Sequence, residues 1–189
     1  MSISVGIDLG RLRDHTAIAA IERMRDGRTV VRFVERVKLG TPWSVVVERV
    51  RRIVTDERMA GRCAVAVDAT GVGSPVVEML QKAGLGCEIV PVTITSGERE
   101  SQTAQGWSVP KKDLMMGLQL GLEDGTLRIA RRMRDVGALV RELVDVKVTG
   151  SRMGAEGAGQ HDDLVIALAL ACWRGKRRKE NLFGKVRLF

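Results

Sequence analysis

Four aspartates of this chain stand at the ends of apolar segments, where an isolated carboxylate is costly to bury. Asp8 and Asp68 each end a run of small and β-branched apolar residues, and the pair Asp162-Asp163 precedes a third apolar run. A carboxylate in such surroundings requires an ion-pair partner, hydrogen bonds or a bound metal ion. Hard divalent cations prefer carboxylate oxygens as ligands. The three segments therefore predict a metal site assembled from distant parts of the chain.

Each aspartate also has an ordinary structural interpretation. Asp8 could be an acid at the turn after a strand, and Asp68 could accept a hydrogen bond in an Asx turn. Asp162 and Asp163 stand where helices commonly carry an N-cap or an acid of the first turn. We expect one of this pair to cap the helix and the other to bind metal, and the sequence leaves open which.

Three further side chains are candidates for supporting roles. Asp14 could reach the edge of the metal site, although a plain turn acid has the same pattern. His161 could orient a water or a phosphate, or it could simply flank the helix. Lys111, at the expected start of a helix, could hold a phosphate group, or it could be a solvated lysine.

The charge of the chain favours a polyanionic partner. The 189 residues carry a formal net charge of +8, and nucleic acid is the common partner of such a basic protein. Aromatic residues make up only 3% of the chain and there is no tyrosine, which favours contacts with phosphates over stacking on bases. The longest apolar run, 164–173, is too short to span a membrane, so we expect no membrane partner.

Two basic clusters are the predicted contacts to the DNA backbone. They are Arg131, Arg132 and Arg134, and a C-terminal group of Arg174, Lys176, Arg177 and Arg178. We expect a main domain over 1–173 and a loosely held basic tail over 174–189.

The pattern of apolar residues predicts one α/β domain. Strands are expected at 2–8, 16–23, 29–37, 63–68, 87–95 and 127–129, and helices at 42–55, from 75 to about 83, 109–122, 136–144 and 162–173. Segments 96–108 and 149–160 are polar or rich in glycine, so we expect mobile surface loops there.

The order of these elements resembles the ribonuclease H-like fold, with a mixed central sheet of three antiparallel strands followed by parallel strands, flanked by helices. A helix between the strands at 63–68 and 87–95 implies that these two strands are parallel. In the ribonuclease H-like arrangement the ends of the first and fourth strands are neighbours and a late helix points at them. Asp8, Asp68 and the pair Asp162-Asp163 would then meet at one point.

Several short motifs together resemble the nuclease domain of the large terminase subunit of tailed bacteriophages. They are Gly6-Ile7-Asp8-Leu9-Gly10, Asp14-His15-Thr16, Val67-Asp68-Ala69-Thr70-Gly71-Val72-Gly73, Val109-Pro110-Lys111, and the stretch from His161 to Ala169. Each motif alone is weak, but their order and spacing cover nearly the whole chain. The resemblance implies an endonuclease that cuts concatemeric viral DNA during genome packaging, in the cytoplasm of an infected bacterium or of a bacterium carrying a prophage.

The same resemblance implies a cofactor and partners. Two Mg²⁺ or Mn²⁺ ions about 3.5–4 Å apart activate a water and stabilise the leaving oxygen in phosphodiester hydrolysis. We expect Asp8 to bridge them, with Asp68 and Asp162 and/or Asp163 as the other ligands. Double-stranded DNA, a terminase ATPase motor domain, the portal and the small terminase subunit are the implied partners. The chain has no GxxxxGK[ST] loop, so we expect an excised domain or a free-standing relative that cannot pump DNA alone.

Other functions fit parts of the same pattern. A Holliday-junction resolvase of the ribonuclease H-like superfamily would carry similar acids. An actin-like nucleotide-binding domain would share a glycine-rich first turn such as Gly6-Ile7-Asp8-Leu9-Gly10, but it would need a second domain. A DNA-binding subunit without catalytic activity is a third alternative, and it would have no use for buried carboxylates.

Overall fold

A computed structural model describes residues 2–183 except 11–13, 58, 60, 62, 72, 147, 150–151 and 154–161, and it describes no side chains at 73–74, 148–149, 152–153 and 178–183. The main strands are β1 (Ser2–Asp8), β2 (Ala17–Arg23), β3 (Thr29–Arg36), β4 (Cys63–Asp68), β5 (Glu88–Thr95), β6 (Ser101–Thr103), β7 (Gly106–Pro110) and β8 (Leu127–Ile129). The helices are α1 (Trp43–Val54), α2 (Gly73–Lys82), α3 (Lys111–Glu123), α4 (Val136–Asp145) and α5 (Asp163–Phe183). Two short strands, β9 (Val148–Thr149) and β10 (Arg152–Met153), pair with each other.

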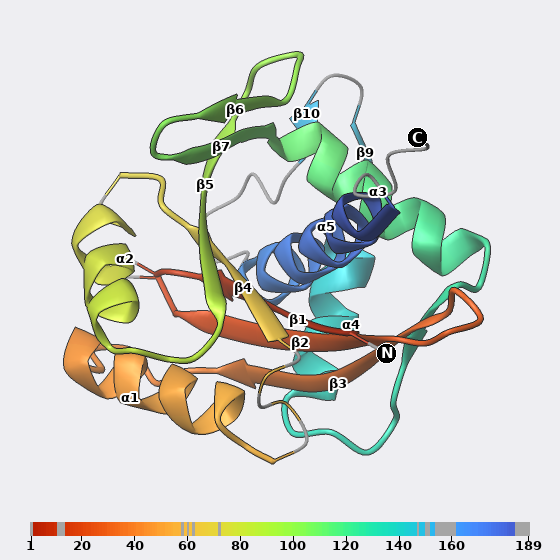
Figure 1. Ribbon diagram of the computed structural model, residues 1–189. Helices are drawn as coiled ribbons and strands as arrows, with labels where there is room; N and C mark the ends of the chain where they lie inside the picture. The colour runs from red at the N-terminus through yellow and green to blue at the C-terminus, as the bar shows by residue number, and fades with distance from the viewer. Residues whose placement is uncertain are drawn as a thin grey trace.

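One mixed sheet organises the described part of the chain, in the order β6-β7-β5-β4-β1-β2-β3-β8 (Figure 1). The first three strands are antiparallel neighbours, whereas β4 pairs in parallel with β1 and with β5. Parallel pairing of β1 and β4 brings their carboxyl ends to the same edge, because Ile7 is paired with Val67. The predicted ribonuclease H-like arrangement is therefore confirmed.

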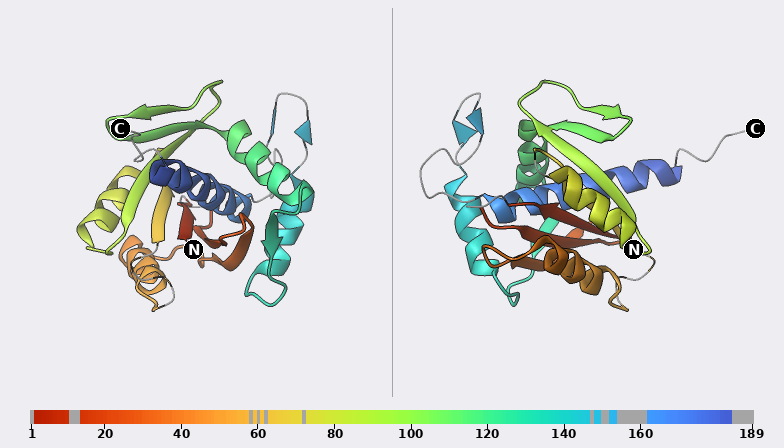
Figure 2. Two further views of the ribbon diagram at one scale, coloured as in Figure 1. Left: turned by 45° about the vertical axis from the view of Figure 1, so that its right-hand side comes forward. Right: turned by 90° about the vertical axis from the view of Figure 1, so that its left-hand side faces the viewer.

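Helices cover both faces of this sheet (Figures 1 and 2). The apolar side of α1, with Val46, Val50 and Ile53, packs with α2 against one face. Helix α5 crosses the other face, where α3 and α4 pack against it. Residues 164–172 of α5 are all buried, which explains why this helix has a continuous apolar run and not a single apolar stripe.

Contact between α5 and β1 depends on glycine at position 6. A Cβ atom built on Gly6 would lie 1.9 Å from the carbonyl oxygen of Ala167 and 2.5 Å from the backbone nitrogen of Ala171. Both of those atoms belong to the helix backbone, which cannot move away as a flexible side chain can. Any larger residue at this position would therefore push α5 off the sheet.

Two expectations about irregular segments need correction. Segment 96–108 is not simply a loop, because it contains β6 and most of β7, which form a hairpin at the edge of the sheet. Its polar composition comes from the exposure of β6, while Trp107 of β7 packs against the core. Segment 149–160 contributes to β9 and β10, and its remaining residues lie outside the described part.

The last helix is longer than the sequence indicated. We expected it to end at Trp173, but α5 continues to Phe183. Arg174 is helical and buried, so a loosely held tail does not begin there, and residues 184–189 lie outside the described part. Among the described residues, no helix combines the length and apolar character that a membrane crossing requires.

The close approach of β1 and α5 can be tested by replacing Gly6. We expect Gly6→Ala to lower the free energy of unfolding by about 3 kcal/mol or more, because overpacking against backbone leaves no room for relaxation. Urea denaturation followed by circular dichroism measures this change. Gly117→Ala is the matched control, because the nearest atom to its added Cβ is the Lys176 Nζ at 3.6 Å, and alanine favours a helix interior by about 1 kcal/mol. Equal stability of the two variants would contradict the close packing.

Candidate functional site

The four predicted aspartates lie where β1 and β4 end and α5 begins. We call this end of the sheet the aspartate edge. Asp8 ends β1, Asp68 ends the neighbouring β4, and Asp162 and Asp163 begin α5. Burial raises the pKa of Asp8 well above its usual value, and the negative charges of Asp68, Asp163 and Asp162 raise it further, while Lys111 opposes them. The carboxylates are thus close enough to repel one another at Asp8.

Asp68 forms the expected turn and also lies near Asp8. Its Oδ1 accepts a hydrogen bond of 2.8 Å from the backbone N–H of Thr70, which is the Asx turn expected after β4. The same carboxylate makes the largest charge contribution to the raised pKa of Asp8. The turn therefore fixes the orientation of Asp68 while its charge faces the neighbouring strand end.

Asp162 and Asp163 have different basic neighbours. The Asp162 Oδ2 lies 2.7 Å from the Nζ of Lys111, which is the first residue of α3. Asp163 is buried, and its Oδ2 lies 3.8 Å from the Nε of Arg36 at the end of β3. Helix α5 thus joins two other elements at this edge through its first two acids.

A fifth acid, Glu142 of α4, was missed by the sequence reasoning. Its Oε2 accepts the backbone N–H groups of Leu164 at 2.9 Å and Val165 at 3.1 Å, and its Oε1 forms an ion pair with Arg36. Burial raises the pKa of Glu142 to about 7, although the hydrogen bond from Val165 and the charge of Arg36 oppose this shift. The only signal in the sequence was an acid in the middle of a mainly apolar helix, in RELV at 141–144.

These side chains suit a hard divalent cation. Among the described residues, no three His, Cys, Asp or Glu side chains are already arranged as a set of ligands, and Lys111 occupies one side of Asp162. The donors are nonetheless all carboxylate oxygens, which Mg²⁺ and Mn²⁺ prefer. A cation beside Asp8 would also relieve the repulsion that raises its pKa. The residues therefore fit the metal, and the assignment of ligands stays a prediction.

The secondary candidates differ in how close they lie to this edge. Lys111 lies within the cluster through its ion pair with Asp162. Asp14 is exposed and borders a small cavity of about 190 Å³ that also includes Gly10 and Thr16, beyond the end of β1. His161 lies outside the described residues.

The first basic cluster lies at the same edge as the aspartates. Arg131, Arg132 and Arg134 are exposed, and the Arg134 guanidinium lies 3.6 Å from Glu35 near the end of β3. The end of β3 is at the aspartate edge, because Arg36 and Asp8 both pair with Ala17 of β2. This position is compatible with the predicted DNA contact.

The second basic cluster lies elsewhere. Helix α5 rises about 1.5 Å per residue, so Arg177 is about 21 Å along the helix from Asp163. Arg174 is 5% exposed and forms an ion pair with Glu88, so the prediction that it contacts DNA is wrong. The reason is that the buried side of α5 continues past Trp173.

The remaining residues of that cluster have mixed environments. The guanidinium of Arg177 lies 4.0 Å from the ring centre of Trp107 and 5.1 Å from that of Trp173, and it pairs with Glu100. Lys176 is exposed. The side chain of Arg178 lies outside the described part. Any DNA contact by Lys176 or Arg177 would thus be remote from the aspartates.

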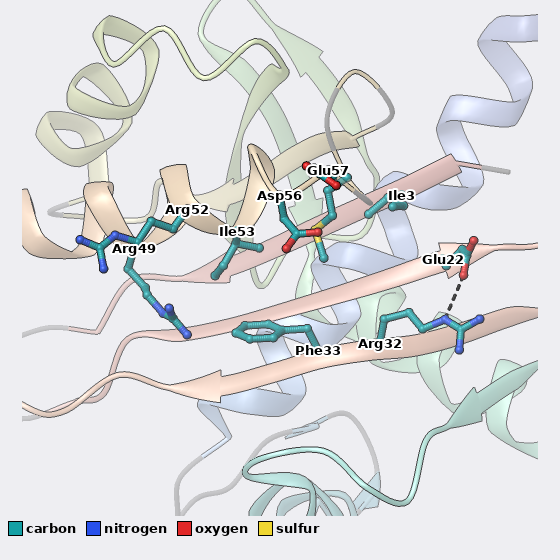
Figure 3. A pocket seen from close by; sticks show the side chains of 10 residues that line it. Ile3, Glu22, Arg32, Phe33, Arg49, Arg52, Ile53, Asp56 and Glu57 are labelled. Atoms are coloured by element: carbon teal, nitrogen blue, oxygen red, sulfur yellow. Dashed lines mark hydrogen bonds and ion pairs between the residues drawn. The ribbon is translucent and has the colours of Figure 1, made fainter.

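A wide cavity of about 860 Å³ lies between α1 and the sheet (Figure 3). Its lining includes Ile3 at the start of β1, Phe33 of β3 and Ile53 of α1, with charged residues at the rim. Arg32 and Glu22 at this rim form an ion pair of 2.9 Å. Ile3 is five residues before Asp8, or about 17 Å along a strand, so this cavity is separate from the aspartate cluster.

Sequence comparison finds similar proteins among viral terminases. No family model matches the chain. The large terminase subunits of Thermus virus P23-45 and Thermus phage G20c are each 27% identical to it over 168 residues, which is 88% of this chain. The chain spans only 30% of the length of these relatives.

Solved structures share its fold. The large terminase nuclease from thermophilic phage G20c superposes with a TM-score of 0.63 and 23% identity, covering 90% of this chain and 80% of that one. The nuclease domain of the large terminase subunit of bacterial virus Sf6, a structure with manganese, gives a TM-score of 0.68 at 12% identity, covering 91% and 88%. The RuvC of T. thermophilus in complex with a Holliday junction gives 0.51 at 15% identity, covering 94% and 96%. The resemblance to large terminase nuclease domains is therefore confirmed, and so is the fold.

The repulsion at Asp8 has a consequence for stability. Because the pKa of Asp8 is raised in the folded state, the protonated carboxyl stabilises the fold relative to the ionised one. This contribution is fully present below the usual pKa of 3.8 and is lost as the pH rises through the raised value. In EDTA we therefore expect Asp8→Asn to raise the Tm at pH 8 by about 2 °C or more, with the difference vanishing near pH 4. Thermal melts across this pH range make the comparison.

Asp26→Asn is the matched control for this experiment. Hydrogen bonds from Arg28 lower the pKa of Asp26, so ionised Asp26 does not destabilise the fold. Replacing it with Asn should therefore leave the Tm at pH 8 unchanged or slightly lower. A lower Tm for Asp8→Asn than for the wild type at pH 8 would show that Asp8 has a compensating partner and is not repelled.

Proposed function

We propose that this chain is a metal-dependent DNA endonuclease of the large-terminase type, which cuts concatemeric viral DNA during genome packaging. The observation that supports this most directly is Asp8 at the end of β1, whose pKa is raised first by burial and then by three other aspartates at the same sheet edge. A cluster of like charges at the end of a β-strand is costly to stability, and such costs are typical of functional sites. The resemblance to terminases supports viral DNA as the substrate.

Two divalent cations, Mg²⁺ or Mn²⁺, are the proposed cofactors. Asp8, Asp68 and Asp162 and/or Asp163 would hold them. When bound, the ions supply an activated water and stabilise the leaving oxygen of the phosphodiester. The manganese in the Sf6 nuclease domain supports this choice of metal.

The protein side chains have distinct roles in this proposal. Asp8 would hold a proton more readily than an ordinary aspartate while no cation is bound, and it would release that proton on cation binding. Lys111 balances the charge of Asp162 at 2.7 Å. If a cation were bound beside Asp162, the Lys111 ammonium would be available to contact the phosphate that is cut.

The DNA would approach the aspartate edge. Arg131, Arg132 and Arg134 are exposed beside the end of β3, and we propose that they contact the backbone. A terminase ATPase motor domain, the portal and the small terminase subunit are proposed partners, and the bacterial cytoplasm is the proposed location. The similar proteins are about three times longer than the matched segment, which leaves room in them for other domains.

A resolvase is the second candidate, because the fold of RuvC is similar over nearly the whole chain. Such an enzyme would cut four-way DNA junctions in preference to linear duplexes. Comparing the rates on a junction and on a duplex of the same sequence distinguishes the two. Faster cutting of the duplex is expected for a terminase-type nuclease.

Cleavage of a supercoiled plasmid tests the proposed activity. We expect nicking and linearisation with Mn²⁺ or Mg²⁺ and none with EDTA, because the site needs a cation. Asp8→Asn and Asp68→Asn should each reduce the rate at least 100-fold, since each removes a proposed ligand. Asp26→Asn, at the far end of the sheet, should cleave as the wild type does. Cleavage in EDTA, or full activity of folded Asp8→Asn, would refute the metal mechanism.

Salt dependence of DNA binding tests the basic cluster. We expect the triple variant Arg131→Ala, Arg132→Ala, Arg134→Ala to bind duplex DNA more weakly and to show a salt slope smaller by up to about 0.9 per lost phosphate contact. Fluorescence anisotropy with Ca²⁺ in place of the catalytic metal measures both quantities.

The control for this experiment removes the same charge at the opposite edge. Arg25, Arg28 and Arg52 are exposed near the far ends of β2 and α1. Their triple alanine variant should keep the wild-type salt slope. An equal loss of DNA affinity and of salt slope in both variants would indicate that DNA binding depends only on the net charge.

A further inference from the structure

The start of α5 has an unusual cap. Asp162 is the N-cap residue, because its carbonyl oxygen accepts the N–H of Ile166 at 2.8 Å. The side chain of an N-cap aspartate normally accepts the N–H groups of the second and third helical residues, which here are Leu164 and Val165. Both of those N–H groups instead donate to the Oε2 of Glu142, a residue of α4.

This arrangement directs the Asp162 carboxylate elsewhere. Its Oδ2 lies 2.7 Å from Lys111, and its charge contributes to the raised pKa of Asp8. If Asp162 capped its own helix, its oxygens would turn toward the N–H groups of Leu164 and Val165. The cap supplied by Glu142 removes the need for that rotamer.

Glu142 is itself held from a third element. Its Oε1 pairs with the guanidinium of Arg36, and the backbone N–H of Arg36 donates to Asp135 at 3.0 Å, just before α4 begins. The Glu142 side chain is 6% exposed, so it has little freedom to turn to solvent. The end of β3 and helix α4 thus fix the oxygen that caps α5.

We propose that Glu142 is a positioning residue, which caps α5 from outside so that the Asp162 carboxylate points at the metal site. The proposal rests on the proposed function, because it concerns the ligands of that site. Glu142 acts through Asp162 and the helix start, and it does not touch the metal. It also explains how Asp162 can be the N-cap residue while its carboxylate is directed at Lys111.

Binding of Mn²⁺ to the full chain without DNA, measured by calorimetry, tests this role. Removing a residue that orients a metal ligand typically lowers metal affinity 10- to 100-fold, and we expect at least a tenfold loss for Glu142→Ala. Glu142→Gln keeps an oxygen that can accept both N–H groups, so its affinity should stay within about threefold of the wild type. Equal losses in the two variants would overturn the capping role in favour of a charge effect.

A double-mutant comparison tests whether the effect passes through Asp162. In an Asp162→Asn background, Glu142→Ala should cause no further loss of Mn²⁺ affinity, because the group that it positions is already absent. A full additional loss would overturn the proposal.

Glu35→Gln controls for the loss of a buried carboxylate as such. Glu35 is nearly as buried and pairs with Arg49 on the other face of the sheet. We expect this variant to lower the Tm without changing Mn²⁺ affinity. Unchanged affinity in Glu142→Ala would refute the positioning role, whereas a wild-type chain that binds no Mn²⁺ would refute the proposed function and this inference with it.

Discussion

The site depends on the direct contact between β1 and α5. Gly6 lets the backbone of the helix approach the strand at Ala167 and Ala171 more closely than any side chain would allow. Further along, Gly175 lies beside Ser4, so α5 runs antiparallel to β1. This direction places the first residues of α5, and not its last, beside the carboxyl end of β1, where Asp8 lies. Helix packing thus decides which charges meet.

The charges that meet there oppose the folding of the cation-free chain. Burial and three neighbouring carboxylates all disfavour ionised Asp8, while Lys111 is the main opposing charge on it. The Arg36 guanidinium lies beside the carboxylates of both Glu142 and Asp163 and offsets their negative charge. Because a divalent cation would compensate this repulsion directly, stability and metal binding are expected to be linked in this protein.

The basic residues that the structure describes differ in exposure and in partners according to their place on the sheet. The exposed arginines after β8 lie at the aspartate edge, where a polyanion would have to approach. Arg174 and Arg177 instead anchor the second half of α5 to Glu88, Glu100 and Trp107. The net charge of +8 therefore overestimates how much positive charge is available to contact nucleic acid.

Local patterns in the sequence determined much of this protein. Alternating and continuous apolar runs predicted the long strands and helices, because periodicity is a local property. The ends of these runs also predicted that Asp8, Asp68, Asp162 and Asp163 stand at the ends of strands or at a helix start. Only the tertiary structure decided that Glu142 caps α5, that Arg174 is buried and that segment 101–110 is a hairpin. Glu142 is 106 residues from Arg36 and Arg174 is 86 from Glu88. Such pairings follow from how helices pack on the sheet, which no single segment encodes.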